Sequence, residues 1–119
     1  MISEYPDMVK DLVKPGTDIL LEVTSEDIHT LHMAVGISGE SGELLDAVKK
    51  AVIYRKPLDR ENVVEELGDL EFYMEGLRQG LGISRSEVLE ANIRKLSKRY
   101  QDGYSDKAAQ DRADKNSGE

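Results

Sequence analysis

A single proline between two long stretches of helical periodicity constrains the fold more than any other residue. Pro57 follows a stretch from residue 25 to about 55 and precedes one from residue 59 to about 80 or 82. Ser25 and Asp59 are the predicted N-caps, because their side-chain oxygens can accept hydrogen bonds from free N–H groups of the first turn. Helices joined by so short a turn pack antiparallel, so the sequence predicts a helical hairpin.

Shorter elements are expected on both sides of this hairpin. Pro6 can begin a short helix to about Lys14, after which Pro15 and Gly16 break it. Residues 17–23 are apolar and fit either a helix or an extended linker. Ser84, with a glutamate three residues later, forms a capping-box pattern that predicts a helix over residues 85–100. Strand-like alternation is absent, so we expect an all-α bundle of four to five helices.

Composition changes after Gln101, where Asp, Lys, Ala, Ser and Gly dominate and the apolar periodicity is lost. We therefore predict one domain over residues 1–104 and a mobile C-terminal tail over residues 105–119. A length of 119 residues fits a single domain.

Composition also narrows the classes of function. The absence of cysteine excludes disulfides and thiolate metal sites, and a net charge of −8 argues against binding of nucleic acid. No apolar run is long enough to span a membrane, and the N-terminus carries Glu4 and Asp7 where a signal peptide would be basic. We expect a cytoplasmic protein. An acidic protein can still bind phosphates through divalent cations.

Two pairs of carboxylates, each spaced three residues apart, lie on the two hairpin helices. Glu40 and Glu43 belong to the first helix, and Glu66 and Asp69 belong to the second. Like charges at this spacing repel, and the antiparallel hairpin brings the two pairs face to face. Mg²⁺ prefers oxygen ligands and keeps water for a substrate, so the pattern predicts a Mg²⁺ site that Mn²⁺ can also occupy.

Either pair alone is more often a solvated helix face. Two features favour a site here: apolar residues are interleaved with the acids, and glycines occur within the helices at a cost of up to about 1 kcal/mol each. These glycines are Gly36, Gly39, Gly42 and Gly68. They indicate close approach of a second helix or of a ligand, and both explanations remain open.

Three segments resemble known family blocks. GESGEL at residues 39–44 and EELGDL at residues 65–70 resemble the two signature blocks of the MazG-like, all-α nucleoside triphosphate pyrophosphohydrolases. NIRKLSKRY at residues 92–100 is similar to that family's later asparagine, lysine and arginine-tyrosine segment. The resemblance covers residues 28–104.

The resemblance implies that a nucleoside or deoxynucleoside triphosphate and water give a monophosphate and diphosphate, by attack at the α-phosphorus. Glu40, Glu43, Glu66 and Asp69 would bind the metal. Glu43 is the first candidate for the residue that takes the proton from water, and Glu40 is the second. Removal of unwanted nucleotides is the role that the family implies.

Five further residues are candidates for substrate binding. Lys95 and Arg99, four residues apart, can neutralise the β and γ phosphates, and Asn92 lies on the same helical side and can contact sugar or base. Tyr100 can stack on a base, and His32 lies along the carboxylate stripe. A solvated basic face, a core tyrosine and a surface histidine are the alternative interpretations.

A non-catalytic or redox metal bundle is the main rival function. Glu26 and His29 form one Glu-x-x-His element of the di-iron type, but no second such element exists. A helical interaction protein with merely solubilising acids is a third hypothesis.

Several apolar stripes predict self-association. A chain of this size has too few helices to cover them all, and the resemblance also implies a homodimer or tetramer. We expect the nucleotide near the subunit boundary, with Asn92, Lys95 or Arg99 approaching the metal site of a partner.

Overall fold

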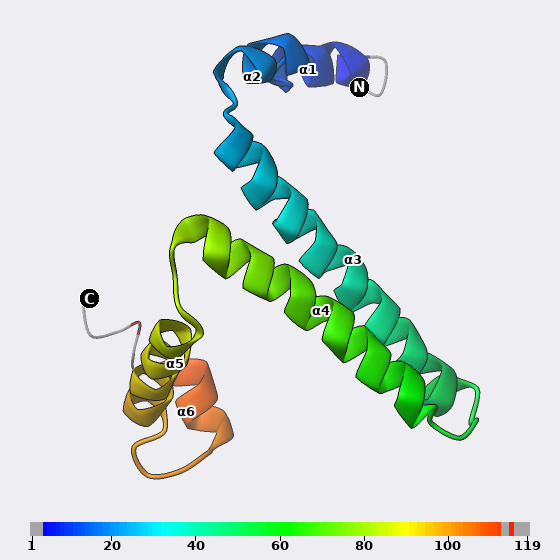
Figure 1. Cartoon of the computed structure of the whole chain (residues 1–119), viewed down its shortest axis with the longest axis vertical. Coiled ribbons are helices and arrows are strands. Elements are labelled where there is room, and N and C mark those ends of the chain that lie inside the picture. The colour runs from blue at the N-terminus through cyan, green and yellow to red at the C-terminus, as the bar shows by residue number, and fades with distance from the viewer. Residues whose placement is uncertain (1–3, 113–114, 116–119) are drawn as a thin grey trace.

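Six helices make up the part of the chain that the computed structural model describes, which is residues 4–112 and residue 115. They are α1 (Tyr5–Leu12), α2 (Gly16–Glu22), α3 (Ser25–Ile53), α4 (Arg60–Leu81), α5 (Arg85–Arg99) and α6 (Asp106–Asp111) (Figure 1). The described residues contain no strand, which confirms the all-α class. Residues 17–22 are helical, and α6 is one helix more than the four to five expected.

Side-chain caps fix the starts of the long helices. Thr24 Oγ1 accepts a hydrogen bond from the Asp27 amide at 3.1 Å, and the Asp27 carboxylate accepts one from the Thr24 amide at 2.9 Å. The prediction of Ser25 as N-cap was wrong by one residue, because only Thr24 has an acid three positions later to complete this box. Asp59 and Ser84 are confirmed as caps, each accepting an amide hydrogen bond at 3.0 Å.

Helices α3 and α4 pack side by side and antiparallel, as Figure 1 shows. Three large side chains each lie directly over a glycine of the facing helix: Tyr73 over Gly36, Met33 over Gly76 and His29 over Gly80. The His29 ring nitrogen Nε2 also donates to the Gly76 carbonyl at 2.9 Å. These contacts let the two helix backbones approach closely and fix the register of the hairpin.

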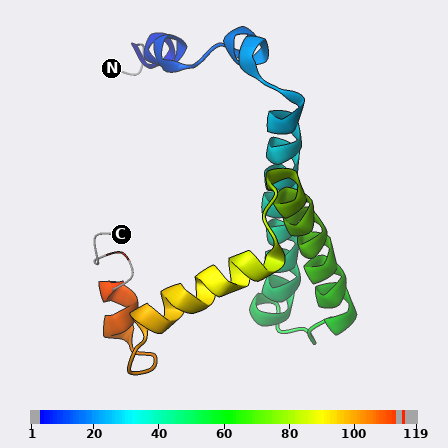
Figure 2. The ribbon, with the colours of Figure 1, turned by 60° about the vertical axis from the view of Figure 1, so that its left-hand side comes forward.

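The other helices do not fold back onto this hairpin. α1 and α2 precede the start of α3, whereas α5 and α6 project away from the end of α4 (Figure 2). The radius of gyration is 20.3 Å, against about 13–14 Å for a compact domain of this length. Met33 is the only buried residue among those described.

The bundle expected from the sequence is therefore not formed within one chain. Only α3 and α4 pack along a continuous line of contact, called the seam below, whereas α5 and α6 touch over a small area. The large apolar side chains of α1 and α5 stay exposed within the described residues. None of the described helices has the length and apolar character needed to cross a membrane.

Substitution of Gly36 by alanine tests the helix seam. The new methyl group would clash with the Tyr73 ring, so we expect Gly36→Ala to lower the free energy of unfolding by about 1–3 kcal/mol in urea titrations. Gly42→Ala is the control, because no atom outside its own helix backbone lies within 4 Å of the added carbon. An unchanged stability in Gly36→Ala would contradict the packing described above.

Candidate metal centre

Three carboxylates from the two hairpin helices meet at one place. Glu40 of α3 and Glu66 and Asp69 of α4 each offer an oxygen, and these three oxygens lie within 4.8 Å of one another. Glu40 and Glu66 are half-buried, whereas Asp69 is exposed. The packing of α3 against α4 brings these carboxylates together. Because Gly36 lies against Tyr73, the antiparallel register sets residue 40 opposite residue 69.

The electrostatics of this cluster are unfavourable without a cation. The pKa of Glu66 is raised from 4.5, first because burial removes water from its carboxylate, and then because the neighbouring Glu40 carboxyl favours the protonated form. Glu43 and Asp69 add negative charge that acts in the same direction. The Oε2 atom of Glu66 is buried and has no hydrogen-bond partner.

A bound divalent cation would reduce the repulsion between these carboxylates. A buried carboxylate oxygen without a donor is costly, and a bound cation removes both the repulsion and the missing contact. Three oxygen ligands from carboxylates suit a hard ion such as Mg²⁺ or Mn²⁺ and leave room for water or phosphate oxygens. The residues present therefore fit the expected metal.

The fourth predicted ligand, Glu43, stands outside the group of three. It lies one turn beyond Glu40 on α3 and is exposed, yet it is near enough to Glu66 to raise the pKa of that residue. Asp46, one turn further along, forms an ion pair with Lys50 at 3.1 Å. Glu43 thus flanks the cluster as an exposed carboxylate.

The predicted phosphate-binding residues lie elsewhere in the chain. Asn92 and Lys95 are exposed on α5, and Arg99 is partly buried at the end of that helix. α5 does not pack along α3 or α4 in the described part of the chain, and α4 alone places Glu66 about 22 Å from its C-terminal end. Within one chain, these residues and the carboxylates are not brought together.

Two other candidates for substrate binding, Tyr100 and His32, make aromatic contacts within the chain. The Tyr100 ring packs against Tyr104, with ring centroids 5.5 Å apart. The His32 ring lies edge-on to Tyr73, with centroids 6.2 Å apart, one turn before Gly36. The role of His32 in substrate binding stays a prediction.

His29 is a seam residue that the sequence analysis did not place. Its spacing of four residues from Met33 and seven from Gly36 is the signal that could have identified it. Since its ring nitrogen binds the Gly76 carbonyl, His29 is engaged in helix packing. This contact weighs against the di-iron element built on Glu26 and His29.

Comparison with known proteins identifies the family. The MazG nucleotide pyrophosphohydrolase domain matches residues 29–104, which contain most of α3, all of α4 and α5, and the three carboxylates. The chain therefore belongs to the MazG nucleotide pyrophosphohydrolase family, as the sequence blocks predicted.

The chain is also similar to the Gene 37 protein of Mycobacterium phage L5. The two are 30% identical over 76 residues, a match that covers 60% of this chain and 67% of the phage protein. No solved structure matches the chain significantly.

Substitution of Glu66 by glutamine tests the electrostatics. Because the pKa of Glu66 is raised in the folded state, the folded protein holds its proton more tightly than the unfolded chain, and Glu66 costs stability as pH rises above 4.5. We expect Glu66→Gln to unfold at higher urea concentration than the wild type at pH 7 without metal, with the difference shrinking toward pH 4.5.

Glu65→Gln is the matched control, since Glu65 is exposed on the same turn of α4. A Glu66→Gln protein that is less stable than the wild type at pH 7 without metal would show that this carboxylate has a structural role instead.

Proposed function

We propose that this chain hydrolyses nucleoside or deoxynucleoside triphosphates to monophosphates and diphosphate with the help of Mg²⁺. Membership of the MazG family indicates a nucleotide pyrophosphohydrolase. The observation that carries the finer proposal is the meeting of Glu40, Glu66 and Asp69 around the unpartnered Glu66 oxygen. Clearing unwanted nucleotides is the role that such an activity would serve.

The residues of the cluster have distinct parts in this proposal. Glu40, Glu66 and Asp69 would hold the ion, which when bound neutralises phosphate charge and makes a nearby water more acidic. Glu43, exposed and outside this group, is free to take the proton of the attacking water. The water oxygen bonds to the α-phosphorus, the bond from that phosphorus to the bridging oxygen breaks, and diphosphate leaves.

A hollow of about 330 Å³ on the same hairpin is the candidate binding site for the base. Phe72 and Gly76, which line it, follow Asp69 by three and seven residues and so share its face of α4. Phe72 exposes 68% of its surface and can stack on a base. The hollow is also lined by His29, Met33, Glu75 and Gln79.

The phosphate-binding residues would come from a partner copy. Since Asn92, Lys95 and Arg99 lie on a helix that leaves the hairpin, they would reach a carboxylate cluster only in an assembly. Exposed apolar side chains on α3 and α4 supply the surface for such an assembly: Val35, Leu45, Val48, Val52, Val64 and Leu67. We propose a homodimer, or a tetramer built from two such dimers, with the nucleotide at the subunit boundary.

A metal-binding bundle without hydrolytic activity remains the rival. The cluster of carboxylates fits any hard divalent ion, but it includes no histidine among the described residues, unlike the Glu-x-x-His pattern of di-iron bundles. Product analysis separates the two functions.

The first activity test is a panel of ribonucleoside and deoxynucleoside triphosphates incubated with protein and Mg²⁺. We expect at least one to yield its monophosphate and diphosphate, resolved by anion-exchange chromatography, and no turnover in EDTA. Release of nucleoside diphosphate and orthophosphate alone would contradict the proposed cleavage position.

Conservative substitutions test the carboxylates individually. Glu40→Gln, Glu43→Gln, Glu66→Gln and Asp69→Asn should each lower kcat/KM at least about 100-fold, because each removes a charge that the metal or the attacking water requires. Glu65→Gln, an exposed neighbour in the same helix, should keep activity within about threefold of the wild type. Full activity in the Asp69→Asn protein would remove this residue from the site.

Mixing two inactive variants tests whether the site is shared between subunits. Glu66→Gln lacks the carboxylate, and a Lys95→Ala/Arg99→Ala double variant lacks the basic pair. After the two are co-refolded, mixed dimers contain one intact composite site, so up to about a quarter of wild-type activity should return. A mixture no more active than its two components would show that the basic pair does not act across the boundary.

A further inference from the structure

The segment before α3 has an apolar surface without a partner among the described residues. This N-terminal arm, residues 4–22, precedes the region that matches the family. Five apolar residues follow the i, i+3, i+4, i+7, i+8 spacing on and just after α1: Tyr5, Met8, Val9, Leu12 and Val13. All five are exposed, Leu12 to 75%. A helix of eight residues is marginal in water alone, so this stripe requires another surface.

Charge indicates which surface that is. The arm holds five carboxylates against two lysines, a net charge of −3. α3 holds five carboxylates against two lysines, and α4 holds six against two arginines, so both hairpin helices repel the arm. α5 has five basic residues against two glutamates, a net charge of +3. Among the described helices, α5 alone is basic.

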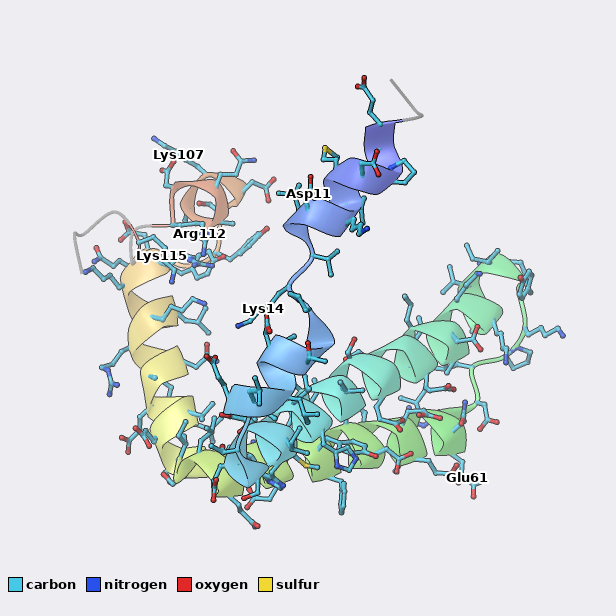
Figure 3. The ribbon with its side chains drawn as sticks, turned by 90° about the horizontal axis from the view of Figure 1, so that it is seen from above. Asp11, Lys14, Glu61, Lys107, Arg112 and Lys115 are labelled. Atoms are coloured by element: carbon cyan, nitrogen blue, oxygen red, sulfur yellow. The ribbon has the colours of Figure 1, made fainter. Side chains whose placement is uncertain are left out.

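α5 also offers a matching apolar stripe. Val88, Leu89, Ile93 and Leu96 recur at helical spacing and are exposed by 41% or more. The carboxylates of the arm include Asp11, which with Lys14 lies on the arm in the view from above (Figure 3), apart from α5. Within one chain the arm and α5 diverge from the hairpin (Figures 1 and 2).

We propose that the N-terminal arm of one copy packs its apolar stripe against the first two turns of α5 of a second copy, around Val88 and Leu89, with arm carboxylates beside Arg85 and with Lys95 and Arg99 left for the nucleotide. A second copy carries both complementary faces, so the exchange can be reciprocal across a two-fold axis. An anionic membrane surface is disfavoured, because it attracts basic segments and the arm is acidic. The contact rests on the proposed assembly but not on the proposed chemistry.

Cysteine crosslinking tests this contact directly, since the chain contains no native cysteine. Full-length Met8→Cys and Leu89→Cys chains, one bearing a mass tag, are mixed, co-refolded and oxidised. We expect a two-chain species that contains one of each. Leu45→Cys on α3 replaces Leu89→Cys in the control mixture, which should give at least about fivefold less of the mixed species.

Three results would overturn the proposal. They are no mixed crosslink above the control, a stronger crosslink to Leu45→Cys, and, in the Met8→Cys/Leu89→Cys double variant, crosslinking only within single chains. Mixed crosslinks in a protein that releases no diphosphate would leave the arm contact standing and remove only the proposed function. Diphosphate release without mixed crosslinks would support the proposed function and overturn the arm contact.

Charge exchange provides a second, independent readout. Asp11→Lys should raise the dissociation constant of the assembly about tenfold in sedimentation experiments, because it places like charge beside α5. Arg85→Glu should weaken the assembly similarly, because Arg85 lies three residues before Val88 on the apolar side of α5, and the two changes combined should restore most of the affinity. Additive losses in the double variant would show that these residues do not face each other.

Discussion

The close approach of α3 and α4 at three glycines is the contact on which the rest of the molecule depends. Tyr73 over Gly36, Met33 over Gly76 and His29 over Gly80 set one register along the whole hairpin. In that register Glu40 comes to lie beside Glu66 and Asp69. A shift by one residue would turn Glu40 away from α4, so packing at one half of the seam fixes the chemistry at the other half.

This packing places carboxylates where a protein of this size would usually bury apolar side chains. Glu40 and Glu66 occupy seam positions, and the raised pKa of Glu66 reports both lost hydration and mutual repulsion. The two halves of the seam therefore differ in what stabilises them. Close packing over Gly36, Gly76 and Gly80 stabilises one half, whereas the carboxylates of the other half repel one another, and a bound cation would reduce that repulsion.

Local signals were sufficient to predict the hairpin and the meeting of three of the four acidic residues predicted as metal ligands. Pro57, with Asp59 as N-cap, located the turn, and the spacing of Glu66 and Asp69 predicted a shared face on α4. The cap of α3 was misplaced by one residue because Thr24 and Ser25 are chemically similar and only the position of Asp27 distinguishes them. Short α6 was not predicted, since residues 106–111 lack an apolar period and are marked by the Ser105 cap alone.

The arrangement of the remaining helices could not be predicted from periodicity. An apolar stripe such as that of α1 or α5 fits a bundle within one chain and an interface between chains equally well, because the pattern records a buried face without its partner. The same ambiguity applies to Lys95 and Arg99, whose spacing predicts a shared helix side but not which cluster of carboxylates they approach. Mobility of residues 105–119 stays a prediction.

The central claim is that Glu40, Glu66 and Asp69 form a divalent-metal site, and Mn²⁺ binding measures it most directly. Electron paramagnetic resonance of free Mn²⁺, titrated with nucleotide-free protein at pH 7, should show saturable binding by the wild type. Asp69→Asn should weaken that binding at least about tenfold, whereas Asp46→Asn, whose carboxylate pairs with Lys50, should not. Equal Mn²⁺ affinity of the wild type and Asp69→Asn would contradict the claim.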